Sequence, residues 1–254
     1  MKKTIIGLLA LFIHIQLFAV ETRIIVRAKA KDAKFIGSSI GGAHVLIRNV
    51  LNGQLLAEGK TSGSTGNTDL IMKTAKERYQ SVTDEQTAKF LAVLDIDEPV
   101  YVNIEVLAPA NNKQAQAKVS TSLWLIPGKH LLGDGIILEV PGFVIDVLKP
   151  RTHQYIALKS VMNTPFEIAA NIVMMCGCTI SEGGIWDAQK IEVKALIKRN
   201  ETPYKEVTMK FADTNLFKGE LIITEQGRYE VMVYAYDLRT GNTGVDKVNY
   251  VVYE

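Results

Sequence analysis

The sequence predicts an all-β protein made of two tandem antiparallel β-sandwich domains, the first with a short helical insertion. Three observations lead to this prediction. Segments in which apolar and polar residues alternate recur along the chain, most clearly at residues 100–109 and 190–199. Turn signals such as Asn52-Gly53 separate these segments. The strand pattern breaks once, near residues 147–154, where a proline and several charges come together.

The first 19 residues have the features of a secretory signal peptide. Lys2 and Lys3 precede an apolar run from Ile5 to Phe18, and the small residue Ala19 follows it. The run is shorter than the ~20 residues that a membrane span needs. We therefore expect cleavage after Ala19, a periplasmic or extracellular location, and no stable membrane insertion of the mature chain.

The mature chain is expected to carry no net charge. The whole sequence has 29 Lys and Arg against 27 Asp and Glu, and residues 1–19 contain two lysines and no acid, which leaves 27 of each. A neutral chain with scattered charges lacks the basic surface that binds nucleic acid or an anionic membrane. We expect a partner among other exported proteins or glycans, and none among nucleic acids.

The first domain is expected over residues 20–148. The Asn52-Gly53 turn lies between two extended segments and predicts a β-hairpin. A helical insertion is expected over about 69–95, with one helix that begins at Thr68 or Asp69 and a second that begins at Thr83 or Asp84. The strands predicted on either side of this insertion are rich in β-branched residues or alternate between apolar and polar residues. They lie at 22–30, 43–50, 54–61, 100–109 and 118–127.

The second domain is expected over residues 152–254, with the boundary between Asp146 and Thr152. Its pattern is purely β. One predicted strand, residues 190–199, turns four apolar side chains to one face and lysines or glutamate to the other. The four inward residues are Ile191, Val193, Ala195 and Ile197.

The end of the chain carries a resemblance. Gly227-Arg228-Tyr229-Glu230-Val231 is followed by Val233-Tyr234-Ala235-Tyr236-Asp237 and then by Gly241-Asn242-Thr243-Gly244. This series resembles the last hairpin of bacterial immunoglobulin-like domains, which often read G-x-Y-x-V-x-V-x-A-x-D before a turn with Gly-Asn. The resemblance covers about residues 150–254 and implies a β-sandwich. It says little of function, because such sandwiches serve many tasks.

The first domain is similar to transthyretin-like modules of the carboxypeptidase regulatory type. The residues that carry this resemblance are the strand Gly41-Gly42-Ala43-His44-Val45-Leu46-Ile47 and the turn Thr65-Gly66-Asn67-Thr68. The helical insertion departs from the pattern of these modules. The resemblance implies a second β-sandwich.

The sequence offers little for enzymatic chemistry. His44, His130 and His153 remain after signal removal, and none has a paired metal-ligand spacing. The G-x-S-x-G and S-x-x-K motifs are absent, and so is a Gly-rich loop with a lysine. The acidic segment Asp95–Glu98 lacks the glycine and the spacing of a calcium loop. We therefore expect a protein that is not an enzyme.

Both cysteines lie in the segment Met174-Met175-Cys176-Gly177-Cys178. If a strand runs through it, Met174, Cys176 and Cys178 share one face. Three sulfur atoms on one face suit a soft metal such as Cu(I), with His153 and Met162 as further ligands if the chain folds back. Copper is the one cofactor that the sequence suggests.

Two other interpretations of this segment stay open. In an exported protein two cysteines usually pair, and Gly177 permits the kink that a Cys176–Cys178 disulfide needs. So small a ring would be easily reduced, which adds a thiol–disulfide redox role. The third interpretation is that the methionines and thiols fill core space beside Trp186.

The function expected from the sequence is therefore that of an exported, non-enzymatic binding or accessory protein that holds a soft metal at Met174, Cys176 and Cys178. The alternative is a structural module of the periplasm or cell surface that interacts with a protein or a glycan. In that alternative the two cysteines form a disulfide or fill the core.

Overall fold

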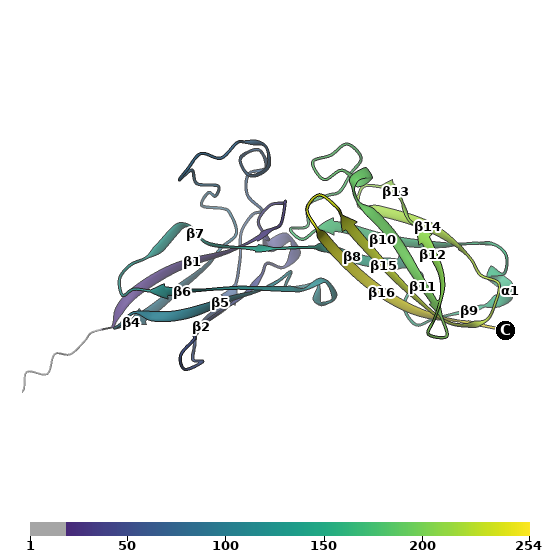
Figure 1. Cartoon of the computed structure of the whole chain (residues 1–254), viewed down its shortest axis with the longest axis horizontal. Helices are drawn as coiled ribbons and strands as arrows, with labels where there is room; N and C mark the ends of the chain where they lie inside the picture. Colours follow the sequence, from purple (N-terminus) through teal and green to yellow (C-terminus); the bar gives the residue numbers. More distant parts are fainter. Residues whose placement is uncertain (1–18) are drawn as a thin grey trace, which may run out of the picture.

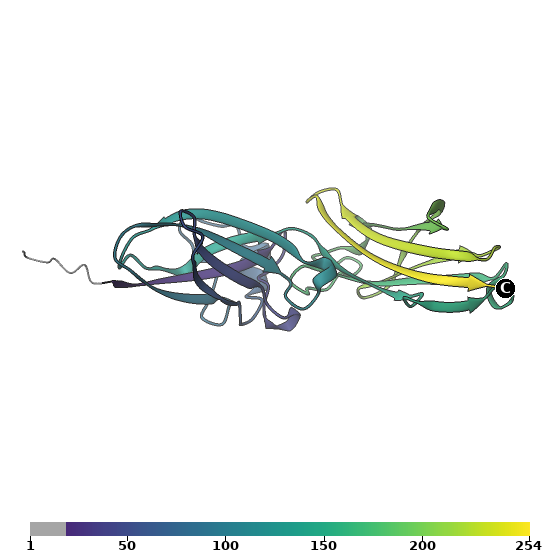
Figure 2. The same ribbon diagram turned by 90° about the horizontal axis from the view of Figure 1, so that it is seen from below.

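The computed structural model describes residues 19–254, which form two β-sandwiches placed end to end (Figures 1 and 2). The predicted signal peptide lies outside the described residues, except for its last residue, Ala19. The C-terminus lies at the end of the second sandwich that is remote from the first (Figure 1). The predicted class, an all-β protein of two β-sandwiches, is confirmed.

The first sandwich packs a three-stranded sheet, in the order β4-β1-β7, on a four-stranded sheet, in the order β3-β2-β5-β6. All pairs are antiparallel except β1 with β7. Its strands are β1 (Val20–Ala30), β2 (His44–Asn49), β3 (Leu55–Lys60), β4 (Phe90–Ile96), β5 (Val100–Ala108), β6 (Ala117–Leu125) and β7 (Leu131–Val140). Short helical turns lie at η1 (Ser38–Ile40), η2 (Asp69–Lys73) and η3 (Lys113–Ala115).

The second sandwich packs the sheet β13-β14-β10-β8 on the sheet β12-β11-β15-β16-β9. All pairs are antiparallel except β16 with β9. Its strands are β8 (Phe143–Lys149), β9 (Gln154–Ala157), β10 (Pro165–Met174), β11 (Glu192–Arg199), β12 (Thr202–Thr208), β13 (Lys210–Asp213), β14 (Leu216–Ile222), β15 (Gly227–Asp237) and β16 (Asn242–Tyr253). Two short helical turns are α1 (Leu158–Val161) and η4 (Ala188–Lys190).

The alternation seen in the sequence corresponds to the buried faces of these sheets. In β5, Val102, Ile104 and Val106 are fully buried between the two sheets of the first sandwich. The Asn52-Gly53 turn joins β2 to β3 as predicted, and Gly53 has a φ of 74°, in the left-handed region that glycine tolerates. Local pattern and tertiary burial therefore agree in these elements.

The final hairpin also follows its predicted pattern. Tyr229 and the alternate residues after it on β15 face the core, and β15 pairs with β16 along its whole length. The Tyr229 hydroxyl donates to the Glu225 carbonyl oxygen at 2.7 Å. Immunoglobulin-like sandwiches have a similar contact, in which a buried tyrosine bonds to backbone a few residues upstream.

The predicted helical insertion over 69–95 is wrong in most of its length. Only the single turn η2 is helical, and Phe90–Ile96 is strand β4. Ala92, Leu94 and Ile96 of β4 face the core while Leu91 and Val93 face outward. The strand forms because β1 offers its free edge, and that pairing satisfies the backbone of β4 better than a short isolated helix would.

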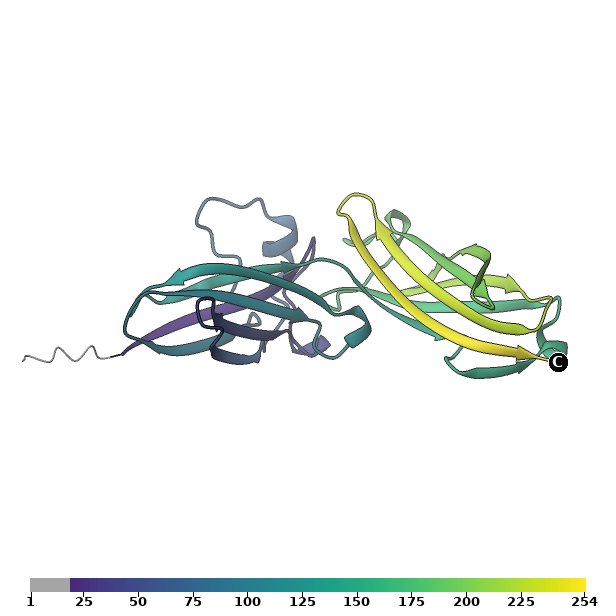
Figure 3. The ribbon, with the colours of Figure 1, turned by 60° about the horizontal axis from the view of Figure 1, so that its bottom comes forward.

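The excursion between β3 and β4 projects from the first sandwich (Figures 1 and 3) and is held by a buried arginine. Arg27 of β1 is almost wholly buried, and its guanidinium donates to the carbonyl oxygens of Thr87, Ala88, Gly133 and Asp134. Burial lowers the pKa of Arg27, whereas the charge of Asp134 raises it. One side chain thus ties the excursion to β1 and to the start of β7.

The predicted boundary between Asp146 and Thr152 also needs correction. β7 ends at Val140 and β8 begins at Phe143, so only Pro141 and Gly142 connect the sandwiches. β8 pairs with β10 and belongs to the second sandwich. Pro150 does end a strand, as the sequence suggested. That strand is β8, which opens the second domain and does not close the first.

The corrected boundary predicts which fragment of the chain folds on its own. A fragment of residues 141–254 is expected to unfold cooperatively, because it keeps β8. A fragment of residues 152–254 lacks the buried Phe143, Val144 and Ile145, each worth roughly 1.5 to 3 kcal/mol of burial, and is expected not to fold. Thermal unfolding followed by circular dichroism compares the two. Equal transitions in both fragments would contradict this assignment of β8.

The buried arginine makes a second prediction. Arg27→Met keeps much of the volume but leaves two buried and two partly buried carbonyl oxygens without this donor, so the free energy of unfolding should fall by about 2 to 3 kcal/mol. Urea unfolding measures the change. Arg23→Met, at a half-exposed position of the same strand, is the control and should change it by less than about 0.5 kcal/mol.

Candidate functional site

The sulfur-rich segment forms a tight turn at the end of β10. The strand ends at Met174, whose N–H donates to the Cys178 carbonyl oxygen at 3.1 Å, while the Gly177 N–H donates to the Met174 carbonyl oxygen at 2.7 Å. Gly177 has a φ of 76°, which favours glycine. The predicted geometry, a strand that places Met174, Cys176 and Cys178 on one face, is therefore wrong, because the chain reverses at Met175 and Cys176.

The two cysteines of this turn are at bonding distance from each other, as a disulfide that spans one residue. Their Cα atoms are 5.4 Å apart, within the range of protein disulfides. Met174, Met175 and Cys176 are almost wholly buried, at 1 to 2% exposure. The segment thus combines two of the sequence interpretations, since it holds a disulfide and also fills a core.

The other residues suggested for a metal site lie elsewhere. Met162 precedes β10 and bridges to Ile223, at the opposite end of that strand from the turn. The N–H of His153 donates to the Asn249 carbonyl oxygen beside β9. Within residues 19–254, no three His, Cys, Asp or Glu side chains gather as ligands for a metal ion. The soft-metal site stays a prediction that rests on the three sulfur residues.

The turn lies against the first sandwich. A Cβ placed on Gly177 would be 3.5 Å from the Cδ1 atom of Ile40, which belongs to η1 of the first sandwich. A Cβ placed on Gly142 would be 2.8 Å from the Cε atom of Met175. The sulfur segment is therefore part of the junction between the two sandwiches.

Hydrogen bonds complete this junction. The Trp186 indole N–H donates to the Asp32 carbonyl oxygen at 2.8 Å. The Asn242 side chain accepts from the Gly142 N–H at 2.9 Å and donates to the Lys31 carbonyl oxygen at 3.0 Å. Asn242 is fully buried. Because buried amides need partners, these bonds bind the connection and both sandwiches together.

Charged groups surround the junction at its rim. Burial would raise the pKa of the Asp237 carboxyl, but hydrogen bonds from the Arg239 guanidinium and backbone outweigh it and hold that pKa below the usual range. The pKa of Asp32 is raised, first by burial and then by the negative charge of Asp237. The rim therefore places two carboxylates from different sandwiches near one arginine.

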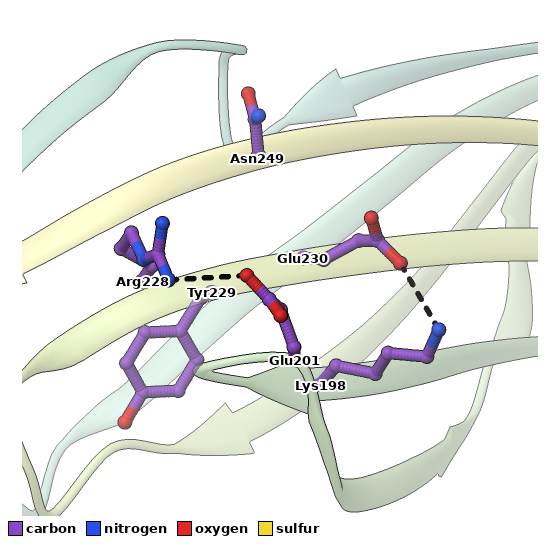
Figure 4. A pocket seen from close by; sticks show the side chains of 6 residues that line it. All are labelled: Lys198, Glu201, Arg228, Tyr229, Glu230 and Asn249. Atoms are coloured by element: carbon purple, nitrogen blue, oxygen red, sulfur yellow. Dashed lines mark hydrogen bonds and ion pairs between the residues drawn. The ribbon is translucent and has the colours of Figure 1, made fainter.

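A hollow of about 230 Å³ lies on the outer face of the second sandwich (Figure 4). Six residues line it: Lys198, Glu201, Arg228, Tyr229, Glu230 and Asn249. Arg228 pairs with Glu201 at 3.1 Å, and Lys198 pairs with Glu230 at 3.6 Å. These charges neutralise each other, so the hollow has no net preference for an anion or a cation. The Tyr229 side chain itself points into the core behind the hollow, and burial raises its pKa to about 12.

No protein-family model matches the sequence, and no curated protein is similar to it. Among solved structures, the chain is similar to the fibronectin(III)-like modules of Clostridium thermocellum CbhA, with 10% identity over 91% of this chain and 93% of that chain and a TM-score of 0.30. It is also similar to an engineered protein, with 12% identity over 48% of this chain and a TM-score of 0.33. The match covers 22% of that engineered chain.

At these TM-scores the description of the fold rests on the strands and burial of this chain itself. Within residues 19–254, no helix has the length and apolar character that a membrane crossing requires.

The junction makes a prediction about Asn242. Asn242→Ala leaves the buried Gly142 N–H and the partly buried Lys31 carbonyl oxygen without this partner, so the free energy of unfolding should fall by about 1 to 3 kcal/mol. Urea unfolding measures it. Asn249→Ala, at an exposed position of the same strand, should change stability by less than about 0.5 kcal/mol. An equal effect of the two substitutions would contradict a role for Asn242 in the junction.

Proposed function

We propose that this chain is an exported, non-enzymatic interaction protein of the periplasm or cell surface, in which the Cys176–Cys178 disulfide stabilises the junction of two sandwiches. The observation that carries the proposal is the position of the Met174–Cys178 turn between them, where Met174, Met175 and Cys176 are buried and Gly177 lies against Ile40 of the first sandwich. A buried cross-linked turn beside a two-residue connection limits movement of one sandwich on the other. The outer sheet faces stay available for a partner.

The soft-metal alternative is less well supported by this geometry. Copper binds cysteine as the thiolate, and sulfurs joined in a disulfide carry no negative charge to offer. Met174 is 2% exposed, so a metal ion would reach its thioether only if the junction opened. We therefore favour the disulfide as a structural cross-link and treat copper binding as the competing outcome of the test.

An oxidising compartment is part of the same proposal. Disulfides persist in exported proteins and are rare in the cytosol. The apolar run before Ala19 and the paired cysteines both point to export.

The test is intact-mass analysis of the native protein, alkylated under denaturing conditions and paired with elemental analysis. We expect a chain that begins at Val20, carries no alkylated cysteine and holds no stoichiometric copper. The double variant Cys176→Ser/Cys178→Ser should lose about 1 to 2 kcal/mol of stability, because the ring is small and its closure removes little chain entropy. A reductant should cause a similar loss in the native protein and none in the double variant, which serves as the control.

Two results would contradict the proposal. A chain that retains Met1 in the cytosol would exclude export. Two free thiols with stoichiometric copper, lost in Cys176→Ser and weakened in Met174→Leu, would favour the soft-metal function instead.

A further inference from the structure

Two aromatic side chains form a pair on the outer face of the first sandwich. Tyr101 of β5 lies directly opposite Trp124 of β6, and their ring centroids are 5.1 Å apart with the planes tilted by 39°. Trp124 is 58% exposed, whereas its neighbour Leu125 is buried in the core. Exposed aromatic side chains that gather on one face make that face a candidate contact surface.

The pair belongs to a row of side chains that crosses the sheet. The N–H of Val50, just beyond the end of β2, donates to the Tyr101 carbonyl oxygen at 2.9 Å, which places Val50 opposite Tyr101. Val50 is 46% exposed. Val50, Tyr101 and Trp124 therefore make one apolar row across three neighbouring strands, which we call the aromatic row.

The next row toward the other end of the sheet is polar. Arg48, Asn103 and Ser122 lie opposite one another on β2, β5 and β6, two residues along each strand from the aromatic row. The Asn103 side chain donates to the Ser122 hydroxyl at 3.0 Å, which fixes the orientation of the amide. Rows on one face are spaced by roughly 6.8 Å along the strands, so a ligand that covers one row reaches the next.

The edge strand β6 keeps this surface open. Its outward residues on the side of the polar row are Ser122 and Ser120, whose side chains are short. The next long outward side chain on β6 is Lys118, which is paired with Glu105. The indole therefore stands above the sheet at the end of a shallow strip of hydroxyl and amide groups.

These groups match the chemistry of a sugar chain. One face of a pyranose ring presents C–H bonds, which stack on an aromatic ring, and its rim presents hydroxyls, which bond to amides, hydroxyls and guanidinium groups. A nucleic acid would need a basic surface, and the polar row has one arginine, with Glu105 on the row after it. A stable protein interface buries about 800 Å² on each partner, more than a row of three side chains supplies.

We propose that the aromatic row, together with Asn103, Ser122 and Arg48, is a binding site for a neutral polysaccharide. One sugar ring stacks on Trp124 and Tyr101, and the next lies over the polar row along β6. The inference rests on the proposed interaction function, for which it names the class of partner. Its occupant is an uncharged glycan chain rather than a protein or an anionic polymer.

The experiment is affinity electrophoresis of the mature full chain in gels that contain hydroxyethylcellulose, xylan, galactomannan or glycogen. At least one polysaccharide should retard the native protein. Trp124→Ala should weaken that binding by about tenfold or more, which corresponds to about 1.4 kcal/mol or more, because the substitution removes the ring on which the sugar stacks. Trp124→Phe should retain part of it, and Asn103→Ala should weaken it without a change in stability.

The matched control is Tyr155→Ala, which removes a 72% exposed aromatic side chain from the outer face of the second sandwich and should leave binding unchanged. Tryptophan fluorescence gives an independent readout. The chain has two tryptophans, and Trp186 is buried, so protection from acrylamide quenching by the polysaccharide reports on Trp124.

Retardation by none of the four polysaccharides would overturn the proposal. So would retardation that persists in both Trp124→Ala and Tyr101→Ala, because the site would then lie elsewhere. Self-association of the native chain that Trp124→Ala abolishes, without glycan binding, would assign this face to a protein interface. The mass and copper measurements do not involve a glycan, so failure of this inference and failure of the proposed function would be seen separately.

Discussion

The placement of the two sandwiches depends on the buried side chain of Asn242. Its amide oxygen accepts from the two-residue connection at Gly142, and its amide nitrogen donates to Lys31 at the end of the first sandwich. Asparagine suits this position because one short side chain offers both a donor and an acceptor. The indole of Trp186 adds a second bond between the sandwiches, to the Asp32 carbonyl oxygen. With so short a connection, these few contacts decide how one sandwich is oriented on the other.

The sulfur-rich turn takes its role from the same junction. Its backbone bonds from Met174 and Gly177 close the turn, and the Cys176–Cys178 bond links its two sides. Methionine is flexible and fills irregular gaps, as Met175 does beside Gly142. Five residues that suggest chemistry when taken alone thus serve to pack two domains against each other. The sulfur atoms of Met174, Met175 and Cys176 would become accessible to solvent only if the junction opened.

The proposed interaction function uses the outer faces of the sheets rather than the junction between the sandwiches. The hollow at Arg228 and Lys198 has its charges paired internally, which leaves little to attract a charged ligand. The aromatic row at Trp124 has no such internal partner beyond Tyr101, and its neighbours are uncharged hydrogen-bonding groups on β5 and β6. A rigid pair of sandwiches would present this face at a fixed position relative to the second domain.

Much of the β-structure could be predicted from the sequence, because strand alternation and turn residues are local properties. Three features follow from neighbouring residues alone. They are the buried residues Val102, Ile104 and Val106 of β5, the Asn52-Gly53 turn, and the alternation that begins at Tyr229 in the last hairpin. Other features depended on segments far apart in the chain. Phe90–Ile96 is a strand because β1 offers it an edge, and β8 joins the second sandwich because β10 pairs with it. The reversal at Cys176, and the meeting of Tyr101 with Trp124, follow from packing and strand register, which only the assembled tertiary structure decides.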